Sequence, residues 1–599
     1  MKAFSFENWK IDDSTKPFLF FVQSMQEMLF HYGHDSYKVP TLNFYFLCLE
    51  VLQSIQKVED NIIDKGNLRP LLDELYEVFS NDFVAQKIYG DDFDVLFYSK
   101  DDKGEYSKGF SQLRKDIGNE TSVKAIQRTI SFLVNDMKIG DKYFETLKAE
   151  ITKVLYSVSF DIDAEYRLSM LSRTFLTELI NRGYNQEYIY SEIIKRYYSL
   201  DVKITDVSLE VEYLWGLFSF ETKRYNVIVP IKQKDVKNLL ERFKFINVTD
   251  NNERLFGKAF HWIASIEVEA LEPESARNDA VSLISTVVSM KQYNSHTIKA
   301  FEANNVLVKE TETNEETYLS TPVGLLSRGR TRSEEQSYVR IEEMLQRIHI
   351  IGEKFFTAIN LHASAMESKN VSNQLLNLWT IVEVLVAVEK RNNHNKITQI
   401  TNTLTTVLNA SYIKSIIEQL LLDLKHCCAG FSDYLSRIDK GENEYEKLIA
   451  MLICDEFLQV KMELINELTC YPLLRWRIEY YSKQFSNRVN LKNFLFKHRK
   501  RLEWQIVRIY RNRNMIIHDG SHFPYIDLIV QNLHFYVDSL IDTINYYIGR
   551  GYRSLDVIYR LLGNNEFIYY EILDKKDNNQ ALPIRDDFPI VVLGNSYIP

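Results

Sequence analysis

Residues 504–520 have the sequence WQIVRIYRNRNMIIHDG, and this stretch decides how the C-terminal part of the chain is expected to fold. Apolar residues recur in and just before it at the spacing of one helical face: Leu502, Ile506, Ile509 and Ile516. The pattern predicts a helix with one stripe directed toward a core. Gly520 follows as a residue that readily adopts the left-handed conformation in which helices end.

Polar side chains gather near the end of the same helix. At about 100° per residue, Arg511, Asn514 and His518 share one face, and Arg513 lies on its flank. A histidine can take a proton from a 2′-hydroxyl or return one to the leaving oxygen, and an arginine can bind a phosphate oxygen through its planar fork. The patch therefore indicates metal-independent RNA cleavage. The alternative is that these groups only cap and solvate a helix end.

These residues resemble a known family. The segment from Arg513 to His518 (RNMIIH) resembles the R-N-x-x-x-H form of the R-x(4–6)-H signature of the HEPN superfamily, and its flanks resemble the Apea-like branch. Residues 378–385 (LWTIVEVL) are similar to the first domain helix of that branch, with its internal glutamate. Residues 266–276 (IEVEALEPESA) are similar to a segment often found upstream. The resemblance covers roughly residues 260–550.

The resemblance implies a role for individual residues. HEPN domains are helical bundles that commonly dimerise and build one ribonuclease site from two copies of the motif. On this chain the catalytic residues would be Arg513, Asn514 and His518. Arg511 would support them, since it also satisfies the spacing, and which arginine is primary stays open. Glu383 would be a supporting polar contact, unless it is simply a buried, paired acid in an apolar helix.

The resemblance also implies a biological setting. Many HEPN proteins serve bacterial toxin–antitoxin, abortive-infection and other defence systems, so this chain is expected to be an antiphage endoribonuclease whose partners are RNA and a phage-derived trigger. A homodimer or a higher even homo-oligomer is expected. Two other functions stay open: a non-catalytic HEPN protein that binds nucleotides or RNA, and a regulatory scaffold that acts through the N-terminal half.

The charge distribution adds a possible RNA-binding segment. The whole chain has a net charge of −10, which argues against a protein that coats nucleic acid with its entire surface. Residues 488–513, however, contain nine Lys or Arg and one acid, Glu503, a local charge of +8. A solvated helix face is the alternative to a polyanion site. Next to a ribonuclease patch, the expected RNA-binding residues are Lys497, Arg499, Lys500, Arg501 and Arg508.

Composition predicts a mainly α, multidomain protein. The 599 residues suggest about three to five structural units. With 45% hydrophobic and 26% charged residues, wholesale disorder is excluded. Glycine (20) and proline (11) are scarce, which favours long helices. The five cysteines form no C-x-x-C pair, so they are expected to be reduced thiols, and neither a metal nor a cofactor is expected.

Hydrophobic patterning predicts the order of domains. Residues 1–205 are expected to form a helical N-terminal domain with a sensing or regulatory role, and 206–325 a small α/β middle domain. Its strands are expected in RYNVIVPI and HWIASIEVEAL and in the pair NNVLVKET and EETYLSTPV. A helix is expected to follow HWIASIEVEAL, with Glu272 to Ser275 as its cap residues. Residues 326–550 are expected to form the HEPN-type helical bundle. Residues 551–599 are a tail in which FIYYEIL and FPIVVL either add one or two strands to a neighbouring part of the chain or cap the helices.

Two further features concern location and phosphate binding. The N-terminus has no apolar signal core, and no stretch approaches the ~20 apolar residues of a membrane span, so a cytoplasmic protein without membrane contact is expected. Residues 324–331 (GLLSRGRT) have P-loop spacing, but Arg330 stands in place of the lysine. We interpret this segment as a basic linker.

Overall fold

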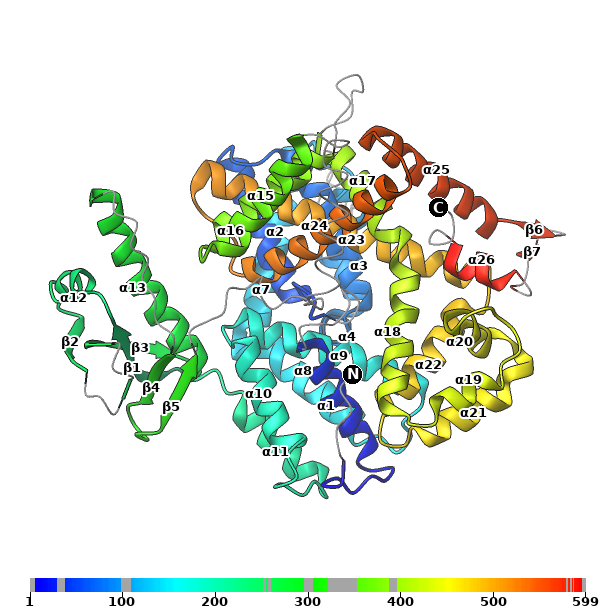
Figure 1. Cartoon of the computed structure of the whole chain (residues 1–599), viewed down its shortest axis with the longest axis horizontal. Coiled ribbons are helices and arrows are strands. Elements are labelled where there is room, and N and C mark those ends of the chain that lie inside the picture. Colours follow the sequence, from blue (N-terminus) through cyan, green and yellow to red (C-terminus); the bar gives the residue numbers. More distant parts are fainter. Residues whose placement is uncertain are drawn as a thin grey trace. The chain divides into compact units, whose positions relative to one another are not determined.

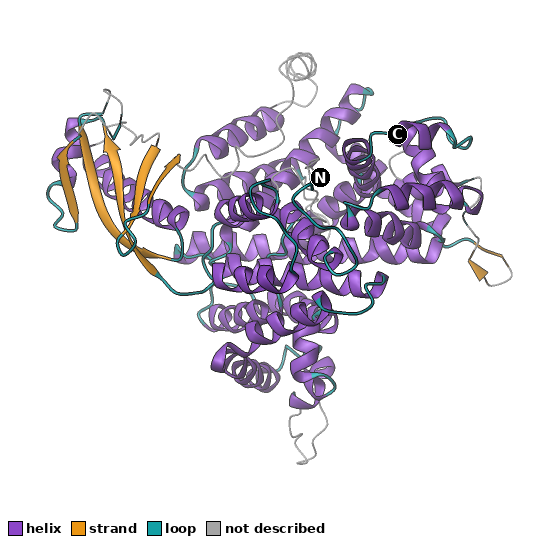
Figure 2. Cartoon of the chain, turned by 90° about the horizontal axis from the view of Figure 1, so that it is seen from below, coloured by secondary structure: helices purple, strands orange, loops and turns teal. Residues whose placement is uncertain are grey.

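The computed structural model describes residues 6–29, 38–97, 109–251, 255–256, 260–295, 305–320, 353–386, 396–577, 580–581, 584 and 587–594. The chain forms two compact units, one made of residues 1–177 together with 329–599 and the other of residues 178–328. The expected mainly α fold with a small sheet in the middle is confirmed (Figures 1 and 2). Among the described residues, no helix is long and apolar enough to cross a membrane. The P-loop-like segment 324–331 lies outside the described residues.

The first unit begins with helices, in agreement with the helical N-terminal region that the sequence predicted. They are α1 (Lys16–Leu29), α2 (Phe44–Glu59), α3 (Leu68–Asn81), α4 (Phe83–Tyr89), α5 (Asp92–Leu96), α6 (Phe110–Leu113), α7 (Glu120–Lys138), α8 (Lys142–Leu155) and α9 (Ile162–Asn181), whose end belongs to the second unit. In α2, Leu47, Val51 and Ile55 recur at helical spacing and are buried. The side chain of Asn43 accepts a hydrogen bond from the Phe46 amide and so caps the start of α2.

The same unit continues with the helices of the C-terminal half. They are α15 (Glu353–Glu367), α16 (Val371–Leu385), α17 (Lys396–Ala410), α18 (Tyr412–Cys427), α19 (Phe431–Ser436), α20 (Glu444–Ile453), α21 (Leu458–Glu467), α22 (Pro472–Phe485), α23 (Arg488–Asp519), α24 (Ile526–Gly549), α25 (Leu555–Leu573) and α26 (Phe588–Leu593). Two short strands, β6 (Lys576–Asp577) and β7 (Gln580–Ala581), pair between α25 and α26.

The N-terminal helices do not form a compact unit apart from this bundle. Glu50 of α2 and Glu74 of α3 are ion-paired with Arg508 of α23. The side chain of Gln23 in α1 donates a 2.7 Å hydrogen bond to the carbonyl of Cys470. The expected boundary between residues 1–205 and the C-terminal bundle therefore differs from the observed division, because buried partners from both ends of the sequence satisfy one another.

The second unit is built on an antiparallel sheet, preceded by α10 (Gln186–Tyr197) and α11 (Val207–Leu217). Its strands have the order β2-β3-β1-β4-β5, with bounds β1 (Lys223–Ile231), β2 (Ile246–Asp250), β3 (Trp262–Ala270), β4 (Asn305–Glu310) and β5 (Glu316–Ser320). The sequence predicted β1, β3, β4 and β5. It missed β2 and the short helix α12 (Lys234–Leu240), and it placed the start of this domain later in the chain.

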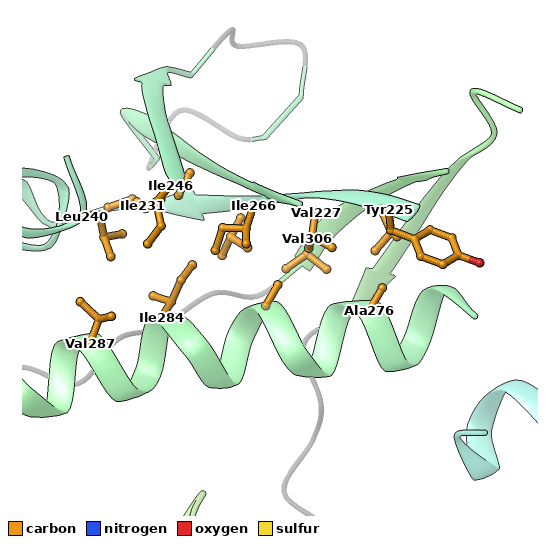
Figure 3. Close-up of a cluster of buried hydrophobic side chains, with 14 of the residues drawn as sticks. Tyr225, Val227, Ile231, Leu240, Ile246, Ile266, Ala276, Ile284, Val287 and Val306 are labelled. Carbon is orange, nitrogen blue, oxygen red and sulfur yellow. The ribbon is translucent and has the colours of Figure 1, made fainter. Parts of the chain in front are cut away.

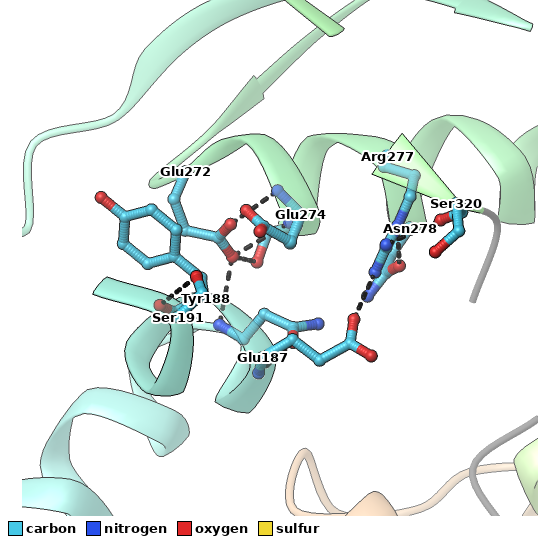
Figure 4. Close-up of polar contacts among 10 residues, drawn as sticks. Glu187, Tyr188, Ser191, Glu272, Glu274, Arg277, Asn278 and Ser320 are labelled. Carbon is cyan, nitrogen blue, oxygen red and sulfur yellow. Dashed lines mark hydrogen bonds and ion pairs between the residues drawn. The ribbon is translucent and has the colours of Figure 1, made fainter. Parts of the chain in front are cut away.

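Helix α13 (Pro273–Ser295) covers one face of the sheet (Figure 3). Alternate residues of β1, among them Val227 and Val229, are buried, as expected of a strand with one face against a core. Ala276, Ala280 and Ile284 line the facing side of α13 and complete this core. The side chain of Glu272 accepts hydrogen bonds from the amides at the start of α13, so the expected cap at this position is confirmed (Figure 4).

The C-terminal tail is helical where strands were considered possible. FIYYEIL lies in α25 and FPIVVL forms α26. In α25, Ile558, Leu562, Tyr569 and Leu573 are buried at intervals that suit a helix. Phe567 and Ile568 at the start of FIYYEIL are exposed. A continuous apolar run does not by itself distinguish a strand from a helix.

Candidate functional site at the end of helix α23

Helix α23 carries the whole basic segment and the Arg–His motif. Its first turn is capped by Asn487, whose side chain accepts a 2.8 Å hydrogen bond from the Asn490 amide. Its last residue is followed by Gly520 with φ of 65°, so the predicted left-handed end of the helix is confirmed. Leu502, Ile506 and Ile509 are buried, as the apolar stripe predicted.

Arg513 lies beside the acid that the resemblance singled out. Its Nη2 atom is 3.8 Å from Oε1 of Glu383 in α16, and its Nη1 atom donates a 3.1 Å hydrogen bond to Oδ1 of Asn514. The side chain of Arg513 is 25% exposed, so it is held by its neighbours and still accessible from solution. The structure thus brings together Arg513, Asn514 and Glu383.

Glu383 has further partners that fix its carboxylate. The Trp379 Nε1 atom, one helical turn earlier, donates a 2.9 Å hydrogen bond to Glu383 Oε1, and Lys396 Nζ lies 3.2 Å from the same oxygen. The Trp379 ring is buried and packs against Tyr510 of α23. Glu383 is therefore a paired acid in an apolar helix and also a neighbour of Arg513; the two alternatives raised by its sequence context are compatible.

His518 is exposed in the last turn of α23. The next residue, Asp519, forms an ion pair with Lys57 of α2 and accepts a hydrogen bond from the Ser521 hydroxyl. The hydrogen bond from Lys57, followed by that from Ser521, lowers the pKa of Asp519. The backbone next to His518 is thus tied to α2, while the imidazole itself is open to a substrate or to another protein chain.

Arg508 and Arg511 point to the interior instead. Arg508 Nε lies 3.0 Å from Glu50 Oε2, and its other end pairs with Glu74. Arg511 pairs with the second oxygen of Glu50. Both arginine side chains are at most 3% exposed. Arg508 therefore lies in the interior and not on an RNA-facing surface, and the proximity of Arg511 to Asn514 and His518 on a helical projection does not give it access to solvent.

The electrostatics of this buried cluster fit a structural role. Burial alone raises the pKa of Glu50, but the charges of Arg508 and Arg511 outweigh that effect and lower it overall. Burial is the largest cause of the raised pKa of Glu74; the negative charge of Glu50 adds to it, and the charge of Arg508 opposes both. Two guanidinium groups thus keep Glu50 ionised inside the protein.

The rest of the basic segment is only partly available to a polyanion. Arg499 is paired with Glu566 of α25 and with Glu503, and Lys500 Nζ lies 2.7 Å from Glu503. Lys497 and Arg501 are exposed. From Lys497 to Arg513 the helix advances by about 24 Å, so these cations extend along α23 and do not surround the Arg–His pair.

The arrangement suits phosphate binding followed by proton transfer. Arg513 provides a held but accessible guanidinium, Asn514 an amide, and His518 an exposed imidazole, all within the last two turns of one helix. One group of described residues has metal-ligand geometry, and it consists of His362, His534 and Asp538. It contains none of the Arg–His residues.

Sequence reasoning missed several residues that shape the site. The hydrogen bond between Trp379 and Glu383 was visible as a spacing of four residues in a predicted helix. Lys57 and Lys396 had no such signal, because they come from other helices.

No family model matches this chain, and neither the curated proteins nor the solved structures give a significant match.

Proposed function

We propose that this protein is a metal-independent endoribonuclease of the HEPN type that acts as an antiphage effector. The observation that carries the proposal is the pairing of Arg513 with Glu383, five residues before an exposed His518 at the end of the same helix. Glu383 and Arg513 belong to two of the segments that resemble the Apea-like branch, and these segments are 130 positions apart in the sequence.

In the proposed reaction His518 removes the proton of a 2′-hydroxyl, whose oxygen attacks the adjacent phosphorus. Arg513 donates two hydrogen bonds to the non-bridging oxygens and stabilises their added charge in the transition state. The bond from phosphorus to the 5′-oxygen breaks, and that oxygen receives a proton. The products are a 2′,3′-cyclic phosphate and a 5′-hydroxyl.

The proposal includes a homodimer. The Arg–His motif supplies one exposed imidazole per chain, that of His518, while the reaction has one proton to remove and one to deliver. The nearby exposed His522 directs its Nδ1 atom to the carbonyl of Phe523. A second copy of the same helix end would supply the second imidazole. The apolar side chain of Ile517, 48% exposed next to His518, is compatible with a partner surface here. Sedimentation of the free protein tests this point, and a monomer with full cleavage activity would contradict it.

The decisive experiment compares two histidines at equivalent places. His518 and His426 are both exposed and both lie in the last turn of a helix, α23 and α18 respectively. His518→Ala is expected to lower the rate of RNA cleavage by about 100-fold or more, and His426→Ala to leave it unchanged. Equal activity in both variants would refute the proposed chemistry.

The substrate and the products provide a second test. DNA and 2′-O-methyl RNA should remain intact because they lack the nucleophile, and EDTA should not inhibit cleavage of RNA. RNA that binds without being cleaved, at an affinity that falls in Arg513→Ala, would instead support the non-catalytic RNA-binding function.

A further inference from the structure

Two histidines and an aspartate converge in a part of the first unit that the proposed reaction does not use. His362 belongs to α15, and His534 and Asp538 lie one turn apart on α24. The Nε2 atoms of the two imidazoles are 3.0 Å apart, and Oδ1 of Asp538 lies 3.2 Å from His362 Nε2 and 3.8 Å from His534 Nε2. The three ligand atoms therefore face a common point.

From this geometry we infer that His362, His534 and Asp538 form a binding site for a borderline divalent metal ion such as zinc. Ligand atoms at ~2.0–2.1 Å from a tetrahedral zinc lie about 3.3–3.4 Å from one another. The three distances in this cluster lie on both sides of that value. Two imidazole nitrogens and one carboxylate oxygen are also a ligand set that suits zinc.

The surroundings of His534 act on its charge in opposite directions. Burial is the largest influence and lowers the pKa of His534, and Lys38 acts in the same direction, against the attraction of Asp538. A neutral imidazole offers the lone pair that a metal requires. Lys38 weakens the attraction for a cation, while the carboxylate of Asp538 offsets it.

Hydrogen bonding alone leaves the arrangement poorly explained. If His362 donates its single Nε2 proton, Asp538 and the lone pair of His534 Nε2 must share it. If His362 accepts from His534, it presents a lone pair to the carboxylate. A metal ion in the middle would satisfy all three lone pairs at once.

The site would connect the helices around Glu383. Helix α16, which carries Glu383, packs against both α15 and α24, and these are the two helices that the metal would link. Asp538 is half exposed, so the cluster is in contact with solvent, from which a water could supply a fourth ligand. A metal bound here would fasten α15 to α24 around α16 and would take no part in the cleavage chemistry.

The test measures zinc bound by the full-length protein after dialysis against zinc and gel filtration. We expect about one zinc per chain, and binding at least about 100-fold weaker in His362→Gln and in His534→Gln. His426→Gln, which alters an exposed histidine outside the cluster, should bind zinc as the wild type does. A protein that binds no zinc, or whose zinc content is unchanged in both cluster variants, would overturn the inference.

Two additional measurements keep the test decisive. Asp538→Asn changes a half-exposed side chain and serves if a histidine variant does not fold. Zinc should raise the melting temperature of the wild type and have no effect on that of the Asp538→Asn variant. The inference does not depend on ribonuclease activity. The EDTA assay, repeated in the His534→Gln background, distinguishes an effect of this metal site from a metal requirement of the cleavage reaction. Inhibition by EDTA that disappears there would be attributed to this metal, whereas inhibition that persists would contradict the proposed reaction.

Discussion

The guanidinium of Arg511 is bound to the carboxylate of Glu50, which lies 461 positions earlier in the chain, and both side chains are buried. This buried ion pair distinguishes Arg511 from Arg513, the other arginine that satisfies the R-x(4–6)-H spacing. Arg511 uses its charge to hold α23 against α2, and Arg513, two residues later, remains accessible beside Glu383. Arg513 is therefore our choice for the arginine that contacts RNA.

Replacing Glu50 should destabilise the first unit. In Glu50→Gln, Arg508 retains only Glu74, and Arg511 loses its buried counter-charge. Removing one partner of a buried ion pair costs about 3–5 kcal/mol, so we expect the free energy of unfolding to fall by about 3 kcal/mol. Urea unfolding measures the change. Glu59→Gln, at an exposed position of the same helix, is the control and should have little effect. A stable Glu50→Gln protein would show that the cluster does not hold the two helices together.

The same cluster predicts how Arg511→Ala will behave. Any loss of RNA cleavage in this variant should accompany a loss of stability, because Glu50 is left with less positive charge around it. Cleavage per folded molecule should stay close to the wild-type rate. If Arg511→Ala is fully folded and inactive while Arg513→Ala cleaves RNA, Arg511 is the catalytic arginine.

Arg513→Lys should be folded and strongly impaired. Lysine keeps the charge but lacks the planar fork that binds two phosphate oxygens, so we expect a loss of about 100-fold in cleavage rate. Glu383→Gln should show a smaller loss, because glutamine still accepts the hydrogen bond from Trp379 but no longer attracts Arg513. Single-turnover cleavage of a short RNA, with circular dichroism as the check on folding, measures both effects. Wild-type rates in Arg513→Lys would count against a bidentate phosphate contact.

The basic segment should contribute to RNA binding through its exposed members. Each phosphate contact contributes about 0.7 to the slope of log affinity against log salt for single strands. We expect Lys497→Gln with Arg501→Gln to lower that slope by about one to one and a half. Arg499→Gln should alter the slope less, because Arg499 is already paired with Glu503 and Glu566. Fluorescence anisotropy at several salt concentrations provides the comparison. An unchanged slope in the double variant would indicate that these cations are only a solvated helix face.

The sequence was sufficient for elements that depend on local patterns. The helix through 504–520, its end at Gly520 and the strands of the β1–β3 pair follow from periodicity and from the conformational freedom of one glycine. Which side chains of a helix point toward the core was harder to predict. A helical projection shows that Arg511 and His518 share a face, but it does not show that Arg511 is buried. That burial depends on the ion pair of Arg511 with Glu50, which local sequence does not reveal. Likewise, His534 and Asp538 are a visible i,i+4 pair, and His362, 172 positions away from His534, is not predictable from local spacing.

The second unit should become less stable as the pH rises from about 5 to 8. Burial, followed by a hydrogen bond with Glu274, raises the pKa of Glu272 from the ordinary 4.5 to about 8 (Figure 4). Between these values the folded protein retains a proton that the unfolded chain releases. The free energy of unfolding is therefore highest below about pH 4.5 and falls as the pH approaches 8, by a few kcal/mol at most.

Hydrogen exchange of the α13 amides in the full chain, corrected for the intrinsic pH dependence of exchange, measures this change. Glu274→Gln removes the neighbouring negative charge, so the pKa of Glu272 should fall and the dependence on pH should become flatter. Glu269→Gln, at an exposed position in β3, is the matched control and should retain the wild-type slope. Stability of α13 that rises between pH 5 and 8 would mean that Glu272 is ionised in the folded protein. In that case the amides of Asn185, Glu274 and Ser275, which all donate to its carboxylate, would outweigh the effect of burial.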